Sequence, residues 1–131
     1  MTVLQIKNEV MFQTNNDVDD LGDFLPYLMD YINEGYDKLV YAYTGVHTGV
    51  HTDSEYDTYE PLTSDLDEPK LPEWTHRSLV DWATWLVYRN GNPQKQNRGY
   101  PFRAAFDEVL GKITAEGGKN GKVRYFKNIP L

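Results

Sequence analysis

Two histidines spaced four residues apart are the first feature of this sequence that could do chemistry. Residues 44–52 read TGVHTGVHT and place His47 and His51 just before Asp53. On an α-helix this spacing would present both imidazoles to one metal ion, but two glycines and repeated β-branched residues disfavour a helix here. On a strand the two side chains would lie about 13 Å apart, too far to share an ion. We therefore predict one arm of a β-hairpin or a long ordered loop.

An acidic stretch, NNDVDD at residues 15–20, suggests a calcium loop. Asp17 and Asp19 fall at alternate positions, Asp23 follows four residues later in the same register, and a glycine, Gly22, lies among them. A calcium loop also needs a glutamate at its twelfth position, because that residue supplies a bidentate ligand. The twelfth residue from Asp17 is Leu28. The pattern therefore favours a solvated acidic turn over an ion site.

The third histidine, His76, follows Glu73 at a spacing of three residues. Such a pair can act as a general base, but on a helix it is more often a surface pair. The sequence contains no nucleophile elbow, no phosphate-binding glycine loop and no zinc-hydrolase motif. It has no cysteine, which excludes disulfides and thiolate chemistry. We predict no enzyme activity, no catalytic residues, no cofactor and no metal site.

All three tryptophans lie in residues 71–90, the stretch on which the other elements must pack. Its apolar side chains recur at helical spacing and occupy more than one face, which is typical of a helix covered from two directions. Pro72 suits the first turn, and Glu73 suits the positive end of the helix dipole. The run Asn90–Pro93 predicts the end of the helix. The residues of the stripe are Trp74, Leu79, Trp82, Ala83 and Leu86, with Val80 and Val87 beside it.

Three further helices follow from capping and periodicity. Thr2 and Gln5 form a capping-box pattern that predicts a helix over residues 2–14. Residues 23–43 carry a regular apolar stripe, interrupted by Gly35, which would let another helix approach closely. A fourth helix should follow Pro93, with a break or a new start near Tyr100 because Pro101 disrupts a helix interior.

The predicted fold class is mainly α, a small bundle of about four helices in a single domain, residues 1–131. The helical core comprises residues 2–43 and 71–114. Residues 44–70, which include seven acidic side chains between 53 and 70, would form a projecting arm, either a β-hairpin or a long loop. Residues 115–131 would form an extended C-terminal tail whose apolar side chains need a partner to cover them.

Charge is distributed unevenly along the chain, which carries a formal net charge of −7. Residues 1–87 hold 4 basic and 17 acidic side chains, whereas residues 88–131 hold 9 basic and 3 acidic ones. In a ring, an acidic face could meet the basic face of the next subunit; the alternative is that both faces are simply solvated. The sequence has no run that could span a membrane and no signal-peptide pattern, which predicts a protein made in the cytosol.

Two stretches, residues 6–40 and 71–113, together resemble the head-to-tail adaptor (connector) proteins of tailed bacteriophages. The first has a short helix leading to a helix with the centre YINEGY. The second has a proline, a helix, a short loop and a helix with spaced aromatics. In this sequence the proline lies in Leu71-Pro72 and the helix contains Val80-Asp81-Trp82-Ala83. The loop is Asn90-Gly91-Asn92, and the next helix carries Phe102, Phe106 and Leu110. Gly99-Tyr100-Pro101 and the repeated TGVH unit depart from the family pattern.

This resemblance implies a structural virion protein that forms a ring, with the dodecamer expected, between the portal and the tail. Its partners would be copies of itself, the portal protein and a tail or second neck protein. DNA would pass through the ring as cargo, and the protein would be made in the host cytoplasm and located in the neck of the virion. The alternative is a small monomeric phage-encoded binding or regulatory module without catalysis. A metal-dependent enzyme using His47 and His51 is a more distant third.

Overall fold

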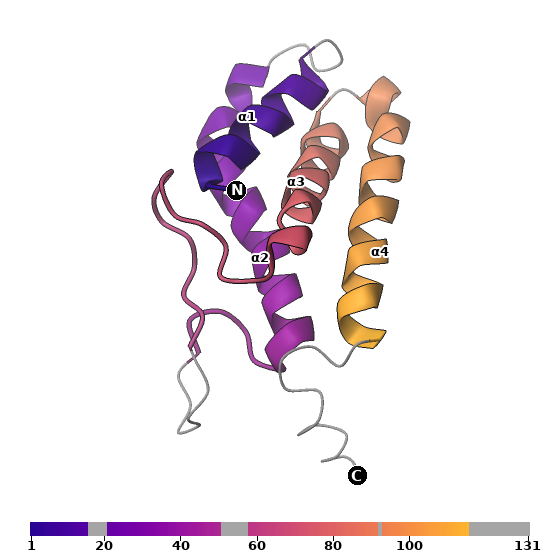
Figure 1. Ribbon diagram of the computed structural model, residues 1–131. Helices are drawn as coiled ribbons and strands as arrows, with labels where there is room; N and C mark the ends of the chain where they lie inside the picture. Colours follow the sequence, from indigo (N-terminus) through magenta and orange to yellow (C-terminus); the bar gives the residue numbers. More distant parts are fainter. Residues whose placement is uncertain (16–20, 51–57, 92, 116–131) are drawn as a thin grey trace.

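The computed structural model describes residues 1–15, 21–50, 58–91 and 93–115, and within them it confirms a mainly helical fold with four α-helices (Figure 1). These residues contain no β-strand. The α-helices are α1 (Val3–Thr14), α2 (Leu28–Thr44), α3 (Arg77–Asn90) and α4 (Tyr100–Ala115). Four short 3-10 helices accompany them: η1 (Leu21–Asp23), η2 (Leu25–Tyr27), η3 (Glu73–Thr75) and η4 (Pro93–Gly99).

Helix α3 is the centre of the bundle. It packs against α1, α2 and α4, and in Figure 1 it lies between α2 and α4. Every residue from Ser78 to Tyr88 is buried except Asp81, which is half-buried. The prediction of a helix that needs cover from more than one direction is therefore confirmed. Trp82 and Trp85 belong to the core, whereas Trp74 is 48% exposed and lies outside it.

Helices α2 and α3 approach each other closely at Gly35. A Cβ atom added there would lie 2.9 Å from Cδ1 of Trp82, which is closer than packed atoms tolerate. The absence of a side chain at Gly35 therefore allows the contact. On the α4 side, the Trp82 ring packs against Phe106, with 4.8 Å between ring centroids. Trp82 thus joins three helices in one layer of the core.

The helix boundaries follow local signals with two corrections. The capping box of α1 is present, because the Thr2 side chain accepts from the Gln5 N–H and the Gln5 side chain accepts from the Thr2 N–H. The predicted start at residue 23 is wrong, since two 3-10 turns precede α2. The helix predicted from residue 71 likewise begins with η3, and α3 starts only at Arg77. The new start expected near Tyr100 is confirmed, and Pro101 falls in the first turn of α4.

The arm predicted to project from the bundle is corrected for residues 58–72, which we call the strap. Its side chains Tyr59, Leu62 and Leu71 are buried, so this segment runs along the helices of its own chain (Figure 1). The hairpin is not supported within the described residues: one hydrogen bond joins the Gly49 N–H to the Tyr59 carbonyl, without strand assignment on either side. Gly49 has a φ of 79°, which interrupts an extended conformation. Residues 51–57, and residues 116–131 of the predicted tail, lie outside the described residues.

Hydrogen bonds explain why the strap lies on the bundle. The first N–H groups of a helix have no partner within it, and in α1 the N–H groups of Val3 and Leu4 donate to the carbonyls of Asp67 and Asp65, at 2.8 and 2.9 Å. The Asn33 side chain both donates to and accepts from the Leu62 backbone, each at 2.8 Å. These bonds satisfy backbone groups that would otherwise be left unpaired at the bundle surface.

The contact between Gly35 and Trp82 can be tested with a pair of glycine substitutions. Gly35→Ala should lower the free energy of unfolding by about 1 kcal/mol or more, because overpacking costs outweigh the gain in helix propensity. Gly111→Ala is the matched control, since Gly111 is exposed within α4 and an added Cβ would meet no atom within 4 Å. It should raise stability by up to about 1 kcal/mol. Urea unfolding of both variants measures the difference, and equal effects would contradict the close contact.

Candidate functional site

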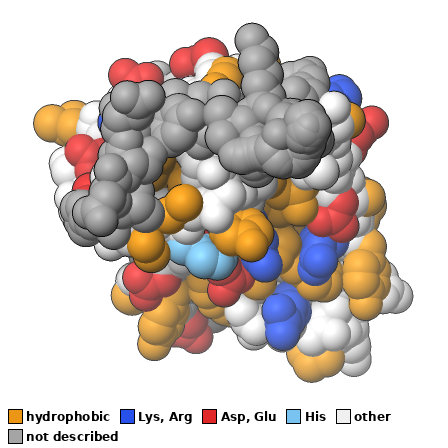
Figure 2. Space-filling model, turned by 90° about the horizontal axis from the view of Figure 1, so that it is seen from below, with side chains coloured by type: hydrophobic (Ala, Val, Ile, Leu, Met, Phe, Trp, Pro, Cys, Tyr) orange, Lys and Arg blue, Asp and Glu red, His pale blue; other side chains and the backbone are white. Residues whose placement is uncertain are grey.

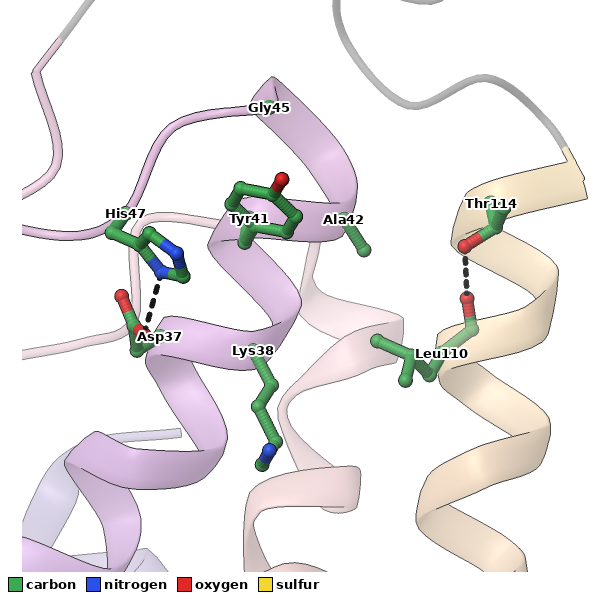
Figure 3. Close-up of a pocket in the computed structure, with 8 residues that line it drawn as sticks. All are labelled: Asp37, Lys38, Tyr41, Ala42, Gly45, His47, Leu110 and Thr114. Atoms are coloured by element: carbon green, nitrogen blue, oxygen red, sulfur yellow. Dashed lines mark hydrogen bonds and ion pairs between the residues drawn. The ribbon is translucent and has the colours of Figure 1, made fainter.

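A groove of about 600 Å³ lies between the C-terminal halves of α2 and α4 (Figure 3). Figure 2 looks at this end of the molecule, where a histidine and hydrophobic side chains are exposed beside a group of basic side chains. The groove has mixed chemistry, because a phenol ring, an aliphatic side chain, a carboxylate and an imidazole face it. Its lining residues are Asp37, Lys38, Tyr41, Ala42, Gly45, His47, Leu110 and Thr114.

The end of α2 brings His47 back onto its own helix. Gly45 terminates α2 with a φ of 84°, a left-handed conformation that glycine adopts without strain, and its N–H donates to the Tyr41 carbonyl. The chain then reverses, and the imidazole of His47 stacks on Tyr41 with ring centroids 4.4 Å apart. Its Nδ1 lies 2.9 Å from Oδ2 of Asp37. The stack and the hydrogen bond together fix the orientation of the imidazole.

The carboxylate of Asp37 receives further hydrogen bonds from the same loop. The backbone N–H and the hydroxyl of Thr48 both donate to its Oδ1, at 2.8 and 3.1 Å. Desolvation raises the pKa of Asp37, but the hydrogen bonds from Thr48 and His47 outweigh it, so the pKa lies below its ordinary value. The ionised carboxylate therefore holds residues 45–48 against α2. An imidazole oriented by a carboxylate can accept a proton or bind a metal through its other nitrogen.

A second arrangement places cations over the core tryptophans. The guanidinium carbon of Arg103 lies 5.1 Å from the ring centre of Trp82 and 5.8 Å from that of Trp85. The ammonium of Lys38 also lies 5.1 Å from the ring centre of Trp82. Arg103 therefore covers the rings of two tryptophans, which is a cation–π arrangement.

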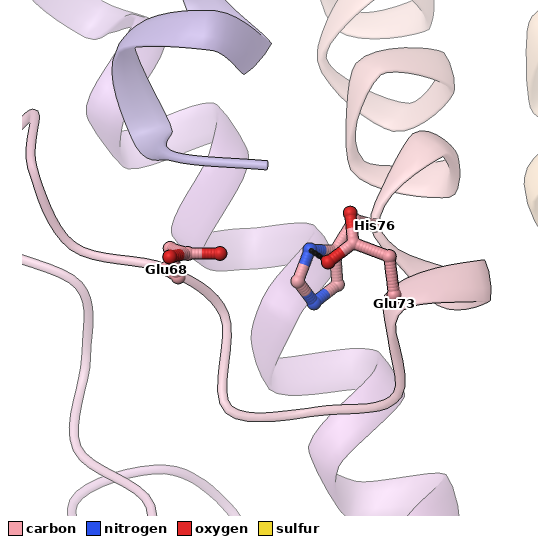
Figure 4. Close-up of side chains that lie close together, drawn as sticks. All are labelled: Glu68, Glu73 and His76. Carbon is pink, nitrogen blue, oxygen red and sulfur yellow. Dashed lines mark ion pairs between the residues drawn. The ribbon is translucent and has the colours of Figure 1, made fainter.

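A third cluster gathers Glu68 from the strap, Glu73 from η3 and His76 at the start of α3 (Figure 4). The Nδ1 of His76 lies 3.6 Å from Oε1 of Glu73, so the predicted pair forms. The prediction that it is a surface pair is wrong for His76, which is 3% exposed. Its Nε2 lies 2.9 Å from the Leu71 carbonyl oxygen. His76 directly follows η3, at the junction with α3.

The Met1 amino group also belongs to this cluster. It donates to Oε2 of Glu73 at 2.8 Å, lies 2.9 Å from Nδ1 of His76 and is 3.6 Å from Oε1 of Glu68. The hydrogen bond from this amine, followed by the charge interaction with His76, lowers the pKa of the Glu73 carboxyl. A positive group thus lies where the two glutamates and the histidine converge. Sequence reasoning missed Glu68, since no local pattern connects it to His76.

The remaining candidates from the sequence are only partly described. Asp17, Asp19 and His51 lie outside the described residues, so the calcium loop and the pairing of His47 with His51 stay untested. Within the described residues His47 pairs with Asp37, which the sequence did not indicate. No protein-family model, curated protein sequence or solved structure matches the chain. None of the described helices has the length and apolar character that crossing a membrane requires.

Asp81 is the one acid whose pKa is strongly raised among the described groups. Burial raises the pKa of its carboxyl from 3.8 to about 6, and the charge of Arg77 offsets only part of this shift. The folded state therefore holds the proton more tightly than the unfolded state. The contribution of Asp81 to stability is highest below about pH 4 and falls as the pH rises to about 6.

Asp81→Asn should therefore raise the free energy of unfolding at pH 7 by about 1–2 kcal/mol, a value reduced for the partial exposure of this side chain. At pH 3.5 the variant and the natural chain should be nearly equally stable, because the acid is mostly neutral in both states. Urea unfolding from pH 3.5 to pH 7 measures the difference. A pH-independent difference would contradict the raised pKa.

Proposed function

We propose that this protein is a structural protein of a tailed-phage virion, which forms an adaptor ring between portal and tail. The ring, a dodecamer in this proposal, lies in the neck of the virion and extends the channel through which DNA passes. Its partners are further copies of the chain, the portal protein and a tail or second neck protein. The protein is made in the host cytoplasm and catalyses no reaction.

The supporting observation is the separation of charge across the bundle. The strap and η3 carry five acidic side chains and one basic one over residues 58–75, whereas η4 and α4 carry four basic and two acidic ones over residues 93–115. The strap runs beside α1 and α2, and α4 lies on the other side of α3 (Figure 1). The two charged edges therefore do not neutralise each other within one copy.

Opposed edges of this kind favour a head-to-tail contact. When one patch on a subunit binds a different patch on the next, the contact repeats and closes into a ring if the rotation allows. Complementary charge also speeds encounter and sets the register of such contacts. An acidic strap facing a channel would repel the phosphates of passing DNA, so the DNA would not adhere. The resemblance of residues 6–40 and 71–113 to phage adaptors supports the same function.

One observation favours the alternative, a small monomeric phage-encoded binding or regulatory module without catalysis. The strap buries Tyr59, Leu62 and Leu71 on its own helices, so this part of the chain needs no neighbour to cover it. In that function the groove at His47 would be the binding surface. The two proposals differ in what they require of the charged edges. Only the ring requires the acidic edge of one subunit to contact the basic edge of the next.

The ring proposal predicts that the natural chain joins portal rings encoded in the same genome, and that Lys95→Glu with Arg98→Glu weakens this assembly at least about tenfold. Reversing the basic edge brings like charges together, which costs several kcal/mol at a contact. Light scattering of the chain with and without portal rings measures the assembly. The variant should remain folded, because both side chains are exposed or half-buried on η4. Circular dichroism checks this.

Glu108→Lys is the matched control, because it replaces a negative charge by a positive one at an exposed residue of α4 and so makes the same edge more basic. It should assemble as well as the natural chain or better. Equal weakening by both substitutions would contradict charge pairing at this edge. A natural chain that stays monomeric with portal rings present would contradict the adaptor function itself and favour the binding module.

A further inference from the structure

We propose that Glu68, Glu73 and His76 form a binding site for a divalent transition metal, with zinc as the ion that fits best. One ligand atom from each side chain can be chosen so that all lie within 4.8 Å of one another. The three residues come from the strap, from η3 and from the start of α3. The inference does not depend on the adaptor function.

The imidazole of His76 is the observation that distinguishes this cluster from ordinary surface carboxylates. It is 3% exposed, and its Nε2 lies 2.9 Å from the Leu71 carbonyl oxygen. A carbonyl only accepts hydrogen bonds, so Nε2 carries the proton, and the Met1 ammonium, a donor 2.9 Å from Nδ1, makes Nδ1 the acceptor. Nδ1 also lies 3.6 Å from Oε1 of Glu73. Metal-binding histidines are oriented in this way, with the second nitrogen bonded to a carbonyl or carboxylate.

The distances in the cluster suit a tetrahedral ion. Zinc binds nitrogen and carboxylate oxygen at about 2.0–2.2 Å, which separates neighbouring ligand atoms by about 3.3–3.5 Å. Nδ1 of His76 and Oε1 of Glu73 are already 3.6 Å apart. Glu68 has to move by little more than 1 Å, and its side chain is 60% exposed and therefore able to do so. Three protein ligands would leave a fourth position for water.

A cation already lies at the centre of the cluster. The Met1 ammonium lies within 2.9 Å of both Glu73 and His76, and within 3.6 Å of Glu68. It shows that a positive charge at this point meets all three side chains at once. A metal ion would take the place of this ammonium and bring two positive charges to the same ligands.

The ligand set selects among ions. Calcium and magnesium take oxygen ligands, so a neutral imidazole nitrogen in the set disfavours them. Zinc accepts both nitrogen and carboxylate oxygen. Once bound, the ion would tie the strap to the start of α3, because its ligands come from both. Binding to the folded chain alone would raise stability by mass action, about 100-fold in the folding equilibrium at a zinc concentration 100 times the dissociation constant.

The test uses the full chain, stripped with a chelator and titrated with zinc sulfate at pH 7. Isothermal calorimetry should show one zinc ion per chain, and the melting temperature should rise by about 5 °C or more. Calcium chloride should leave it unchanged. A second form with two extra residues before Met1 moves the amino group out of the cluster and should bind zinc at least as tightly.

Two variants locate the site. Glu73→Gln removes a ligand whose side chain is 71% exposed, so the fold should survive while zinc affinity falls at least about tenfold. Glu108→Gln makes the same change at an exposed carboxylate of α4 outside the cluster and should leave zinc binding unchanged. The proposal is overturned if neither the natural nor the extended chain gains stability from zinc. It is overturned equally if Glu108→Gln abolishes binding and Glu73→Gln does not.

Discussion

The burial of α3 on nearly all of its surface is the constraint that the rest of the fold satisfies. Trp82 lies at its centre, against a glycine of α2 on one side and Phe106 of α4 on the other. A buried indole N–H needs a hydrogen-bond partner, and Glu34 supplies it at 3.1 Å. Arg103 then covers the rings where they approach solvent. Packing, hydrogen bonding and surface charge therefore meet in one layer of the bundle.

The features predicted correctly from the sequence are those encoded by neighbouring residues. The capping box at Thr2 involves residues three positions apart, and the apolar stripes of α2 and α3 repeat within one or two turns. The new helix start at Tyr100 follows from Pro101, which acts on its own backbone. Even the close approach at Gly35 could be expected, because a glycine within a regular stripe weakens a helix unless another element needs the space.

The features that the sequence did not predict involve residues far apart in the chain. Asn33 binds the backbone of Leu62, and Lys7 pairs with Asp65 at 2.7 Å. No periodic pattern connects such residues, so the strap was expected to project. The same reason explains why the sequence did not predict the contacts within the two candidate sites. His47 was compared with His51 rather than with Asp37. His76 was expected at the surface because a pair spaced three residues apart on a helix usually lies there, and its neighbour Glu68 is brought close only by the folded strap.

The hydrogen bonds from Val3 and Leu4 to the carbonyls of residues 65–67 have a consequence for the order of biosynthesis. Helix α1 precedes the other described helices in the chain, yet its leading amides obtain their acceptors only when the chain has been translated past residue 67. Until then this helix lacks those acceptors, and it also lacks α3, against which it packs and which begins only at Arg77. The amino-terminal helix should therefore be among the last to become protected from amide hydrogen exchange in a nascent chain.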